Sequence, residues 1–391
     1  MPIKIVTQSE LEDELKKIGV DERAFPIFRD KSNLILLKIY SIDSRAATIL
    51  KQEFIGSGGD VAIHKDVIKF ERDKTDALLI GTERTYSEVL RKLEYQPFFG
   101  LNIFREELNN ALSNLKEDEN NYIDKKPKIM GILNLTIDSF YSASRITDED
   151  SALRKAEEMI KEGVDIIDIG GESTRPGAEP LSEEEELKRV IPVISNIRRR
   201  FENIDLSVDT YKPKVAKEAL EAGANIINII NLSQEMIEFL KTVESPFIFM
   251  HMRGTPKDMQ TYTDYEDVVK ELLLFFEEKI AYLEKNGIKK ERIIIDPGIG
   301  FAKTAKQNFE IVRSIKAFKI FRLPVLIGHS RKSFIGKLLN GIPPEKRLSG
   351  TLAITAYAVL NGADIIRVHD VKENLEVIKV IKEIQKCQEF S

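Results

Sequence analysis

The sequence predicts an α/β protein, a (β/α)8 TIM barrel preceded by a small α/β N-terminal domain. Eight short runs of β-branched and other apolar residues recur in the later part of the 391-residue chain. Stretches with helical periodicity separate these runs, a pattern typical of a parallel sheet. A polar, charged segment precedes them, and the part after it has about the length of a complete barrel. The predicted organisation is therefore a small domain of unknown function (1–112), a linker (113–127) and a barrel (128–391).

The composition excludes several classes of protein. Hydrophobic residues make up 42% of the chain, enough for a sizeable core. The 59 basic and 64 acidic residues nearly cancel to a net charge of −5, so the chain lacks the basic excess typical of nucleic-acid-binding proteins. Cys387 is the only cysteine, which excludes an intramolecular disulfide and a metal site built from several thiolates.

The N-terminal sequence and the lengths of the apolar runs bear on location. Residues 1–17 are polar and charged, without the apolar core of a secretory signal. The most apolar runs, 272–276 and 293–295, are far shorter than the roughly 20 residues that span a bilayer. We therefore expect a cytoplasmic protein that does not enter a membrane.

Two strands and two helices are predicted in the small domain. The strands are 34–40 and 77–80, and the helices are 43–54 and 83–94. A glycine-rich run at 56–59 follows the first helix and has two interpretations. Glycine backbones can approach a phosphate closely, but no Lys-Ser or Lys-Thr pair follows, so a simple turn is favoured. His64 is expected to be structural.

The predicted barrel strands follow one another at the spacing of β/α units. They occupy residues 129–135, 164–169, 206–208, 226–230, 247–250, 293–295, 325–327 and 365–368. Several of the intervening helical stretches end at a glycine that suits the position after a helix: Gly163, Gly223, Gly287 and Gly362. A doubly wound open sheet is the alternative, but such sheets more often have about five to seven strands.

Polar residues gather after the predicted strands, where the active sites of barrel enzymes lie. In chain order they are Asn134, Thr136 and Asp138; Asp168 and Glu172; Asp209; Asn228 and Asn231; His251; Asp296; residues 329–332; and Arg367, His369 and Asp370. A single Asp or Asn at such a place can be only a helix cap. Polar residues after all eight strands instead predict a functional rim, with Asp168 as a structural carboxylate beneath it.

The chemistry of this rim favours a flat heterocyclic ligand that carries an anion. Cationic groups that suit a phosphate ester are Arg175, Lys303, Arg331, Lys332, Arg367 and His369. Asp209 and Asp296 would accept hydrogen bonds from ligand N–H groups, and Asn228 offers a donor and an acceptor. The sequence has neither a Gly-x-Ser-x-Gly motif nor a His-Glu-x-x-His motif, which argues against a serine nucleophile and a zinc site. A bound metal would be a hard cation held through oxygen, for which Mg²⁺ is the natural choice.

Seven motifs in this part of the chain resemble those of dihydropteroate synthases and follow in the order of that family. They are MGILNLTIDSF (130–140), DIGGESTRPGA (168–178), SVDTY (207–211), MHMRGTP (250–256), DPGIGF (296–301), SRKS (330–333) and RVHDV (367–371). The resemblance covers about residues 128–387 and agrees with the barrel predicted from periodicity.

The resemblance implies a transferase that joins (7,8-dihydropterin-6-yl)methyl diphosphate to 4-aminobenzoate, or to an arylamine derived from it, and releases diphosphate. Such enzymes act in folate or methanopterin-type cofactor biosynthesis, and the family leads us to expect Mg²⁺ and a homodimer. The implied pterin-binding residues are Asp209, Asn228, Asp296 and Lys332, and the implied diphosphate-binding residues are Asn134, Arg367 and His369. The implied aminobenzoate-binding residues are Thr174, Arg175, Phe301 and Ser333. The implied catalytic groups are Arg367, His369 and Lys332, with Asn134 beside the metal.

Three departures separate this sequence from the minimal family pattern. Ile137 stands where the first loop usually has proline. Ile229 stands where an aspartate usually follows the asparagine equivalent to Asn228, and the Gly-Gly after it is missing. The N-terminal domain is additional. The pterin half of the site matches the family pattern more fully than the aminobenzoate half. We therefore keep two hypotheses for the amine substrate, free 4-aminobenzoate and a modified arylamine.

Two other functions would use the same barrel. A pterin-binding methyltransferase domain shares the pterin contacts but moves a methyl group. A non-catalytic pterin-binding protein would use the N-terminal domain for interactions. The motifs at 172–177 and 330–333 favour a diphosphate and an arylamine over methyl transfer, and Arg367, His369 and Lys332 favour catalysis over silent binding.

Overall fold

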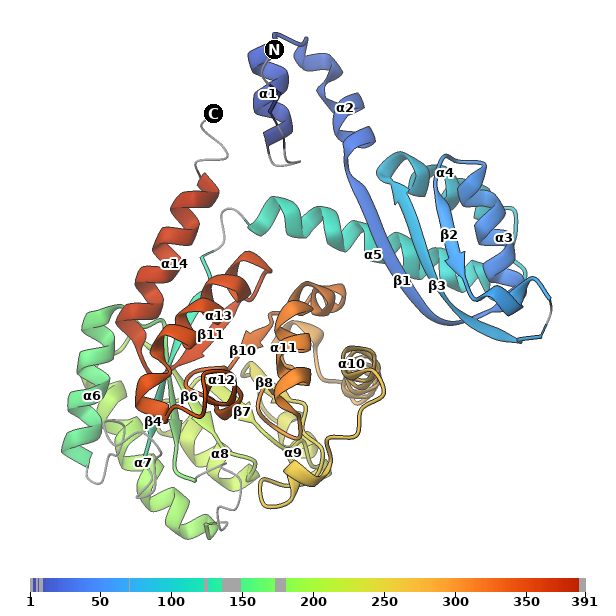
Figure 1. The fold of residues 1–391 in the computed structure, drawn as a ribbon. Helices are drawn as coiled ribbons and strands as arrows, with labels where there is room; N and C mark the ends of the chain where they lie inside the picture. The colour runs from blue at the N-terminus through green and yellow to red at the C-terminus, as the bar shows by residue number, and fades with distance from the viewer. Residues whose placement is uncertain are drawn as a thin grey trace. The chain divides into compact units, whose positions relative to one another are not determined.

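The computed structural model describes residues 3–4, 6, 10–69, 71–122, 126–135, 149–172 and 181–386 (Figure 1). The chain divides into two compact units. One comprises Met1–Glu117 with Gln385–Ser391, and the other comprises Asp118–Ile384. The finer division into a domain of 112 residues, a linker and a barrel stays a prediction.

The N-terminal unit is built on a three-stranded antiparallel sheet in the order β1-β3-β2. Its strands are β1 (Leu34–Asp43), β2 (Asp60–Ile63) and β3 (Lys74–Thr82), and its central helices are α3 (Ser44–Ile55) and α4 (Glu83–Leu93). The two predicted strands and the two predicted helices are confirmed, and β2 is an additional strand. The glycine-rich run forms the turn after α3, where the Gly59 N–H donates to the Phe54 carbonyl at 2.8 Å.

Apolar side chains of α3, α4 and β3 form the core of this unit. Phe54 and Tyr86 meet edge to face, with ring centroids 5.2 Å apart, and both side chains are fully buried. The Tyr86 hydroxyl donates to the Ile35 carbonyl at 3.2 Å. Burial raises the pKa of Tyr86, so this phenol stays protonated and holds α4 against β1. His64 is structural as expected, because its ring accepts a hydrogen bond from the Asp66 N–H at the start of a short helical turn.

Three helices of the N-terminal part lie outside the predicted elements. They are α1 (Leu11–Ile18), α2 (Phe25–Ser32) and α5 (Leu101–Tyr122). The last of these extends through residues 113–122, the first part of the predicted linker. The segment is polar, but it lacks glycine and proline before Pro127, and Leu, Lys and Glu favour a helix whether or not they are buried.

The second unit is a closed barrel of eight parallel strands, as predicted. The strands are β4 (Lys128–Asn134), β5 (Ile166–Gly170), β6 (Asp205–Asp209), β7 (Ile226–Ile229), β8 (Phe247–Met250), β9 (Ile293–Asp296), β10 (Leu326–Ile327) and β11 (Ile365–Val368). They pair in the order β10-β11-β4-β5-β6-β7-β8-β9. A parallel bridge between Ile295 and Val325 joins β9 to β10 and closes the ring.

Helices connect the strands and surround the barrel (Figure 1). They are α6 (Glu149–Glu162), α7 (Glu183–Arg200), α8 (Pro213–Glu221), α9 (Gln234–Leu240), α10 (Val268–Lys285), α11 (Ala305–Arg313), α12 (Ser333–Leu338), α13 (Leu348–Leu360) and α14 (Val371–Lys386). The four glycines predicted to follow helices all have positive φ, as expected after α6, α8, α10 and α13. No helix in the described ranges is long and apolar enough to cross a bilayer.

Two apolar layers fill the barrel unit. Because successive side chains of a strand point to opposite faces of the sheet, each residue belongs to one layer or the other. The outer layer lies between strands and helices and includes Ile167, Ile227 and Ile295. The inner layer fills the barrel interior with Met130, Ile166, Ile226, Ile248, Ile294, Leu326 and Ile365. Residues two or four positions after these inner residues point into the same interior, nearer the carboxyl end of the strands. Asn134, Asp168, Asn228, Asp296, Arg367 and His369 of the predicted rim occupy these positions.

Candidate active site at the carboxyl end of the barrel strands

Four residues form a row across the carboxyl ends of β4, β5, β6 and β7. Asn134 pairs in register with Gly170, Gly170 with Asp209, and Asp209 with Asn228. Gly170 leaves room between its neighbours: a Cβ built at this glycine would lie 3.7 Å from the Asn134 Oδ1 and 3.8 Å from the Asp209 Oδ2. The strand register thus brings an amide oxygen and a carboxylate together at the barrel mouth.

Asp168 lies one layer below this row and joins two rim residues. The Arg367 Nε donates to the Asp168 Oδ2 at 2.6 Å, and the Asn228 Nδ2 donates to the same oxygen at 3.0 Å. The Arg367 Nη2 donates to the Asp209 Oδ2 at 2.8 Å. The Asp168 side chain is fully buried. It is therefore the carboxylate beneath the rim that the sequence predicted, and it orients Arg367 and Asn228 toward the barrel mouth.

The pKa values of Asp209 and Arg367 depend on burial and on the charges beside them. Burial raises the pKa of Asp209 to about 7, the Arg367 charge opposes this rise, and Asp168 adds to it. Burial lowers the pKa of Arg367, but the Asp168 and Asp209 carboxylates raise it above its ordinary value. Arg367 thus stays charged between two carboxylates. A ligand that donates N–H groups to Asp209 would favour the ionised form of the Asp209 carboxylate.

Asp296 and Lys332 form the opposite side of the mouth. Burial raises the pKa of Asp296, and the nearby Lys332 charge opposes this rise. The Gly298 N–H donates to the Asp296 Oδ1 at 2.8 Å, which fixes the carboxylate at the end of β9. Burial lowers the pKa of Lys332 to about 7. The Lys332 ammonium donates to the Ile299 carbonyl and lies 4.4 Å from the centre of the Phe301 ring, so Lys332 and Phe301 line one wall together.

Lys303 and His251 support that wall from inside. The Lys303 ammonium donates to the Phe301 carbonyl at 2.9 Å and lies 3.1 Å from the His251 Nδ1. Burial lowers the pKa of Lys303 to about 7. Burial, reinforced by the nearby Lys303 charge, lowers the pKa of His251 to about 2, so this imidazole is neutral. Lys303 was predicted among the anion-binding cations, but its contacts with the Phe301 carbonyl and His251 hold the loop that carries Phe301.

The loop after β10 contributes both structural and accessible groups. The Arg331 guanidinium forms a bidentate pair with Asp370 at 2.8 and 2.7 Å and donates to two backbone carbonyls. It is buried and held by these partners, which corrects its predicted place among the ligand-binding cations. His369 remains partly exposed, and its Nδ1 lies 2.9 Å from the Ser330 Oγ. Ser333, the first residue of α12, is exposed.

The structure thus places most of the predicted site residues at the carboxyl ends of the barrel strands or directly after them. Those within its described part are Asn134, Asp209, Asn228, Asp296, Phe301, Lys332, Ser333, Arg367 and His369. Thr174 and Arg175 lie outside the described residues, as do Thr136, Ile137 and Asp138 of the first loop. Tyr211 and Lys212, which contact Glu172, were not predicted as functional residues. Their position could have indicated them, because they lie two and three residues after Asp209, the last residue of β6.

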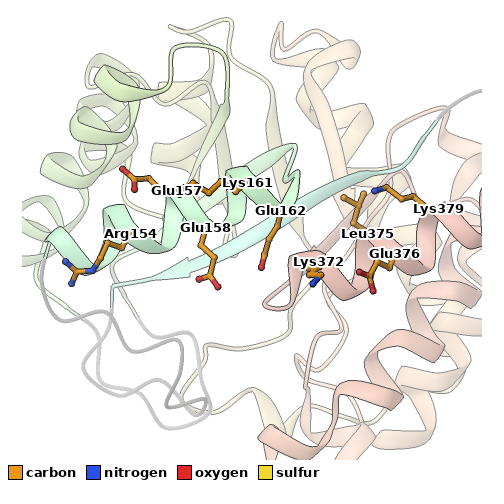
Figure 2. Close-up of a pocket in the computed structure, with 9 residues that line it drawn as sticks. All are labelled: Arg154, Glu157, Glu158, Lys161, Glu162, Lys372, Leu375, Glu376 and Lys379. Atoms are coloured by element: carbon orange, nitrogen blue, oxygen red, sulfur yellow. The ribbon is translucent and has the colours of Figure 1, made fainter.

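A separate groove lies on the outside of the barrel between α6 and α14 (Figure 2). Four basic and four acidic side chains line it together with Leu375. Burial raises the pKa of Glu162 within it. Because its charges balance, the groove does not select an ion of either sign, and none of the predicted site residues line it.

Comparison with known proteins identifies the family. The family described as pterin binding enzyme matches residues 130–369. The dihydropteroate synthase of Escherichia coli is 47% identical over 258 residues, which cover 66% of this chain and 91% of the relative. The chain belongs to the dihydropteroate synthase family. Its activity is accordingly that of a transferase of folate biosynthesis.

Two further dihydropteroate synthases extend the comparison. The "bifunctional dihydropteroate synthase/dihydropteroate reductase" of Helicobacter pylori is 36% identical over 390 residues, covering 98% of this chain and 99% of the relative. A solved structure of the Xanthomonas albilineans dihydropteroate synthase with 4-aminobenzoic acid has a TM-score of 0.62 and 38% identity. It covers 67% of this chain and 94% of that chain. The additional N-terminal part is therefore shared with the Helicobacter pylori dihydropteroate synthase.

Proposed function

We propose that the barrel condenses (7,8-dihydropterin-6-yl)methyl diphosphate with 4-aminobenzoate and releases diphosphate. One observation carries this proposal: in the row that Asn134, Asp209 and Asn228 share, Asp209 contacts Arg367 directly and Asn228 is joined to Arg367 through Asp168. It places acceptors for a heterocycle directly beside a buried guanidinium. Membership of the dihydropteroate synthase family and the 4-aminobenzoic acid complex of the Xanthomonas albilineans relative support the choice of substrates.

The pterin ring would bind between the two sides of the mouth. Asp209 and Asp296 are carboxylates that can accept the paired N–H donors of a 2-amino-4-oxo pyrimidine edge. Asn228 would supply one donor and one acceptor, and Lys332 would donate to a ring nitrogen or to the carbonyl. Because Asp209 and Asp296 are buried, leaving either without its ligand partner is costly, which favours a ligand that satisfies both.

The diphosphate would bind to Arg367, His369 and Asn134. As the carbon–oxygen bond breaks, negative charge grows on the leaving diphosphate, so Arg367 stabilises the transition state more than the bound substrate. The dihydropterin ring is electron-rich and can carry the positive charge left on the methylene carbon. The arylamine nitrogen then forms the new bond to this carbon and loses a proton, so no protein nucleophile is needed.

A magnesium ion fits this half of the site. The Asn134 Oδ1 is a hard oxygen donor at the carboxyl end of β4, and donors of this kind suit Mg²⁺ when substrate phosphates complete its coordination. The described residues contain no cluster of three His, Cys, Asp or Glu that could hold a metal without the substrate. When bound, the ion would neutralise charge on the leaving diphosphate.

The arylamine would lie on the Phe301 side of the mouth. Phe301 offers a ring face, and the exposed Ser333 at the start of α12 offers a hydroxyl. We further propose that Thr174 and Arg175, which lie outside the described residues, bind the aminobenzoate carboxylate. A modified arylamine stays an alternative, because Ile137 and Ile229 depart from the family pattern.

A two-amine assay tests this proposal. Full-length protein would be supplied with the pterin diphosphate, Mg²⁺ and either 4-aminobenzoate or a modified arylamine, and diphosphate release would be followed. We expect turnover with free 4-aminobenzoate. Turnover with the modified arylamine but not with 4-aminobenzoate would identify the modified arylamine as the amine substrate. Absence of diphosphate release with either amine would contradict the proposed activity. A shortened chain that begins near Lys126 would show whether the barrel needs the N-terminal part.

A second activity is suggested by the Helicobacter pylori relative. We propose that this chain also reduces dihydropteroate, because the relative whose name includes a dihydropteroate reductase aligns with nearly the whole chain, including the N-terminal part. Reduction would add a hydride to C6 and a proton to N5 of the dihydropterin ring. The test is tetrahydropteroate formation by full-length protein supplied with 7,8-dihydropteroate and a reduced nicotinamide. Its absence, with and without added flavin, would contradict the second activity.

We also propose that the protein is a cytoplasmic homodimer. Apolar side chains on the last two helices of the barrel support the assembly, since Tyr357 and Leu360 on α13 are 41% and 51% exposed, and Val380 and Ile384 on α14 are 60% and 53% exposed. Exposed apolar residues of this size suit an interface with a second copy. Light scattering of full-length protein and of Leu360→Glu would test it, with a monomeric variant expected.

A further inference from the structure

Ser330 and His369 meet between two neighbouring loops at the barrel mouth. Ser330 lies three residues after β10 and His369 directly follows β11, and these two strands pair with each other in the sheet. The Ser330 Oγ accepts a hydrogen bond from the His369 backbone N–H at 3.2 Å and lies 2.9 Å from the Nδ1 of the same residue. One hydroxyl thus contacts both the backbone and the ring of His369.

A buried ion pair fixes the two loops beside this contact. It is formed by the next residue of each loop, Arg331 and Asp370, whose side chains are only 6% and 11% exposed. The Arg331 Nε and Nη2 donate to the two Asp370 oxygens at 2.8 and 2.7 Å. The Thr351 Oγ1 accepts a hydrogen bond from the Arg331 N–H at 3.0 Å. These contacts hold Arg331 at a φ of +54°, which non-glycine residues seldom adopt, so the fold sets the position of Ser330 against His369.

The contacts of the Ser330 hydroxyl indicate where its proton lies. A serine hydroxyl has one proton to donate and lone pairs with which to accept. Ser330 is buried, and within the described part of the chain its Oγ contacts the N–H and the Nδ1 of His369 and nothing else that is polar. The backbone N–H can only donate, so Nδ1 is the acceptor for the hydroxyl proton. A buried hydroxyl that donates to no acceptor is costly, which favours this arrangement.

The same arrangement decides which nitrogen of the His369 ring carries the proton. A neutral imidazole has one donor nitrogen and one acceptor nitrogen. If Nδ1 accepts from Ser330, the proton of the neutral ring lies on Nε2. His369 lies two residues after Arg367 and belongs to the same face of the strand end. An N–H donor beside the Arg367 guanidinium suits the oxygens of a leaving diphosphate, which gain negative charge as the bond breaks.

We propose that Ser330 is a positioning residue that donates its hydroxyl proton to the His369 Nδ1 and thereby keeps the ring proton on Nε2, as a donor to the leaving diphosphate. The inference rests on the proposed function, in which His369 binds the diphosphate. Ser330 acts through His369 and does not itself bind the substrate. Because the position of the ring proton is a property of the protein alone, it can be measured without turnover.

Nitrogen NMR of the full-length protein tests the position of the proton. The chain has four histidines, so the signals of His369 can be assigned by comparison with His369→Ala. At about pH 8, above the ordinary histidine pKa of about 6.5, we expect a proton on Nε2 and an unprotonated, hydrogen-bonded Nδ1. Ser330→Ala should shift the Nδ1 signal of His369 and leave the other three histidines unchanged. A proton on Nδ1 of the parent protein, or an Nδ1 signal that Ser330→Ala does not shift, would overturn the proposal.

The rate of diphosphate release tests the link to catalysis. Ser330→Ala should lower kcat about tenfold and leave the KM for 4-aminobenzoate within about twofold, because the contact serves the leaving group. In the His369→Ala background the same change should have less than about a twofold effect, since no ring remains to be oriented. Ser330→Thr keeps the hydroxyl and should restore most of the rate. Ser314→Ala, which follows α11 at the opposite end of the barrel, is the matched control.

A merely structural role predicts a different result. Ser330→Ala would then lower the rate equally with and without the His369 ring, and that result would overturn the positioning role. Should Ser330→Ala fail to fold, two changes of His369 replace it. The amide N–H of His369→Gln can lie near the place of Nε2, and that of His369→Asn near the place of Nδ1. His369→Gln should therefore keep the higher kcat, and equal rates or the reverse order would overturn the proposal. Failure of the parent protein to release diphosphate would instead overturn the proposed function, and the NMR measurement would still decide the position of the proton.

Discussion

Asp168 and Arg367 lie 199 residues apart in the chain, yet the carboxylate of one holds the guanidinium of the other at 2.6 Å inside the barrel. β5 carries the carboxylate and β11 carries the guanidinium, with only β4 between them in the sheet. The same carboxylate oxygen accepts a hydrogen bond from Asn228. One buried side chain thus aligns a proposed leaving-group contact and a proposed pterin contact.

Asp168→Asn should lower kcat/KM by about 10- to 100-fold. The amide keeps one acceptor but loses the charge that fixes Arg367, and breaking a buried ion pair costs roughly 3–5 kcal/mol. Steady-state kinetics and urea unfolding of the parent and variant would measure both effects. Parent-like turnover in a folded variant would show that Asp168 does not orient Arg367.

Arg367→Ala should lower kcat by about 100-fold or more and change pterin diphosphate affinity by less than about tenfold, because the contact strengthens as diphosphate leaves. Removal of Arg367 also leaves Asp168 and Asp209 without their shared cation, so unfolding should be followed alongside the rate. A kcat within a few-fold of the parent would rule out the leaving-group assignment.

Asp209→Asn should weaken binding of the pterin diphosphate by about 100-fold, since the amide would present a donor to the ligand's own donors. Asp205→Asn is a matched control at the other end of β6, where the carboxylate contacts Lys128 and Asn225 instead. Isothermal titration calorimetry would compare them. Equal affinities for the two variants would remove Asp209 from the pterin site.

Gly298→Ala should destabilise the fold and raise the KM for the arylamine. Gly298 has a φ of +70°, and a Cβ there would lie 2.0 Å from the His251 carbonyl oxygen. Relief of this clash would move the segment that carries Phe301, at a cost of about 2–4 kcal/mol. Gly287→Ala is the control, because it has a φ of +84° and nothing within 4 Å of its Cβ. Similar unfolding free energies for both variants would contradict the steric explanation.

Lys303→Met should reduce the pH dependence of stability above pH 7. Burial lowers the pKa of Lys303 to about 7 from an ordinary 10.5, so between these values the unfolded chain binds more protons than the folded chain. The contribution of this group to stability is therefore present at high pH and is lost as the pH falls toward 7. Urea unfolding at pH 7 and pH 9.5 would measure the slope in both proteins. An identical slope would show that folding does not lower the pKa of Lys303.

The elements of the N-terminal part were only partly predictable from the sequence. Strands β1 and β3 and helices α3 and α4 were predicted, because their apolar residues alternate with the period of a strand or a helix. Helix α5 was not predicted, because the polar composition of residues 113–122 indicates exposure to solvent and does not by itself indicate a helix. Polarity reports exposure rather than backbone conformation, and residues with good helix propensity form helices in either setting.

The sequence by itself determined the barrel and the places of its rim residues. Strand alternation fixes which residues point inward, so Asp209, Asn228, Asp296 and Arg367 could be assigned to one mouth from their positions after apolar runs. Only the tertiary structure decided which polar residues of the rim are held by partners within the chain. Arg331 is occupied by Asp370, and Lys303 is occupied by the Phe301 carbonyl and His251. A chemical inventory cannot show this, because the charge available to a ligand depends on partners that only the folded chain brings within hydrogen-bonding distance.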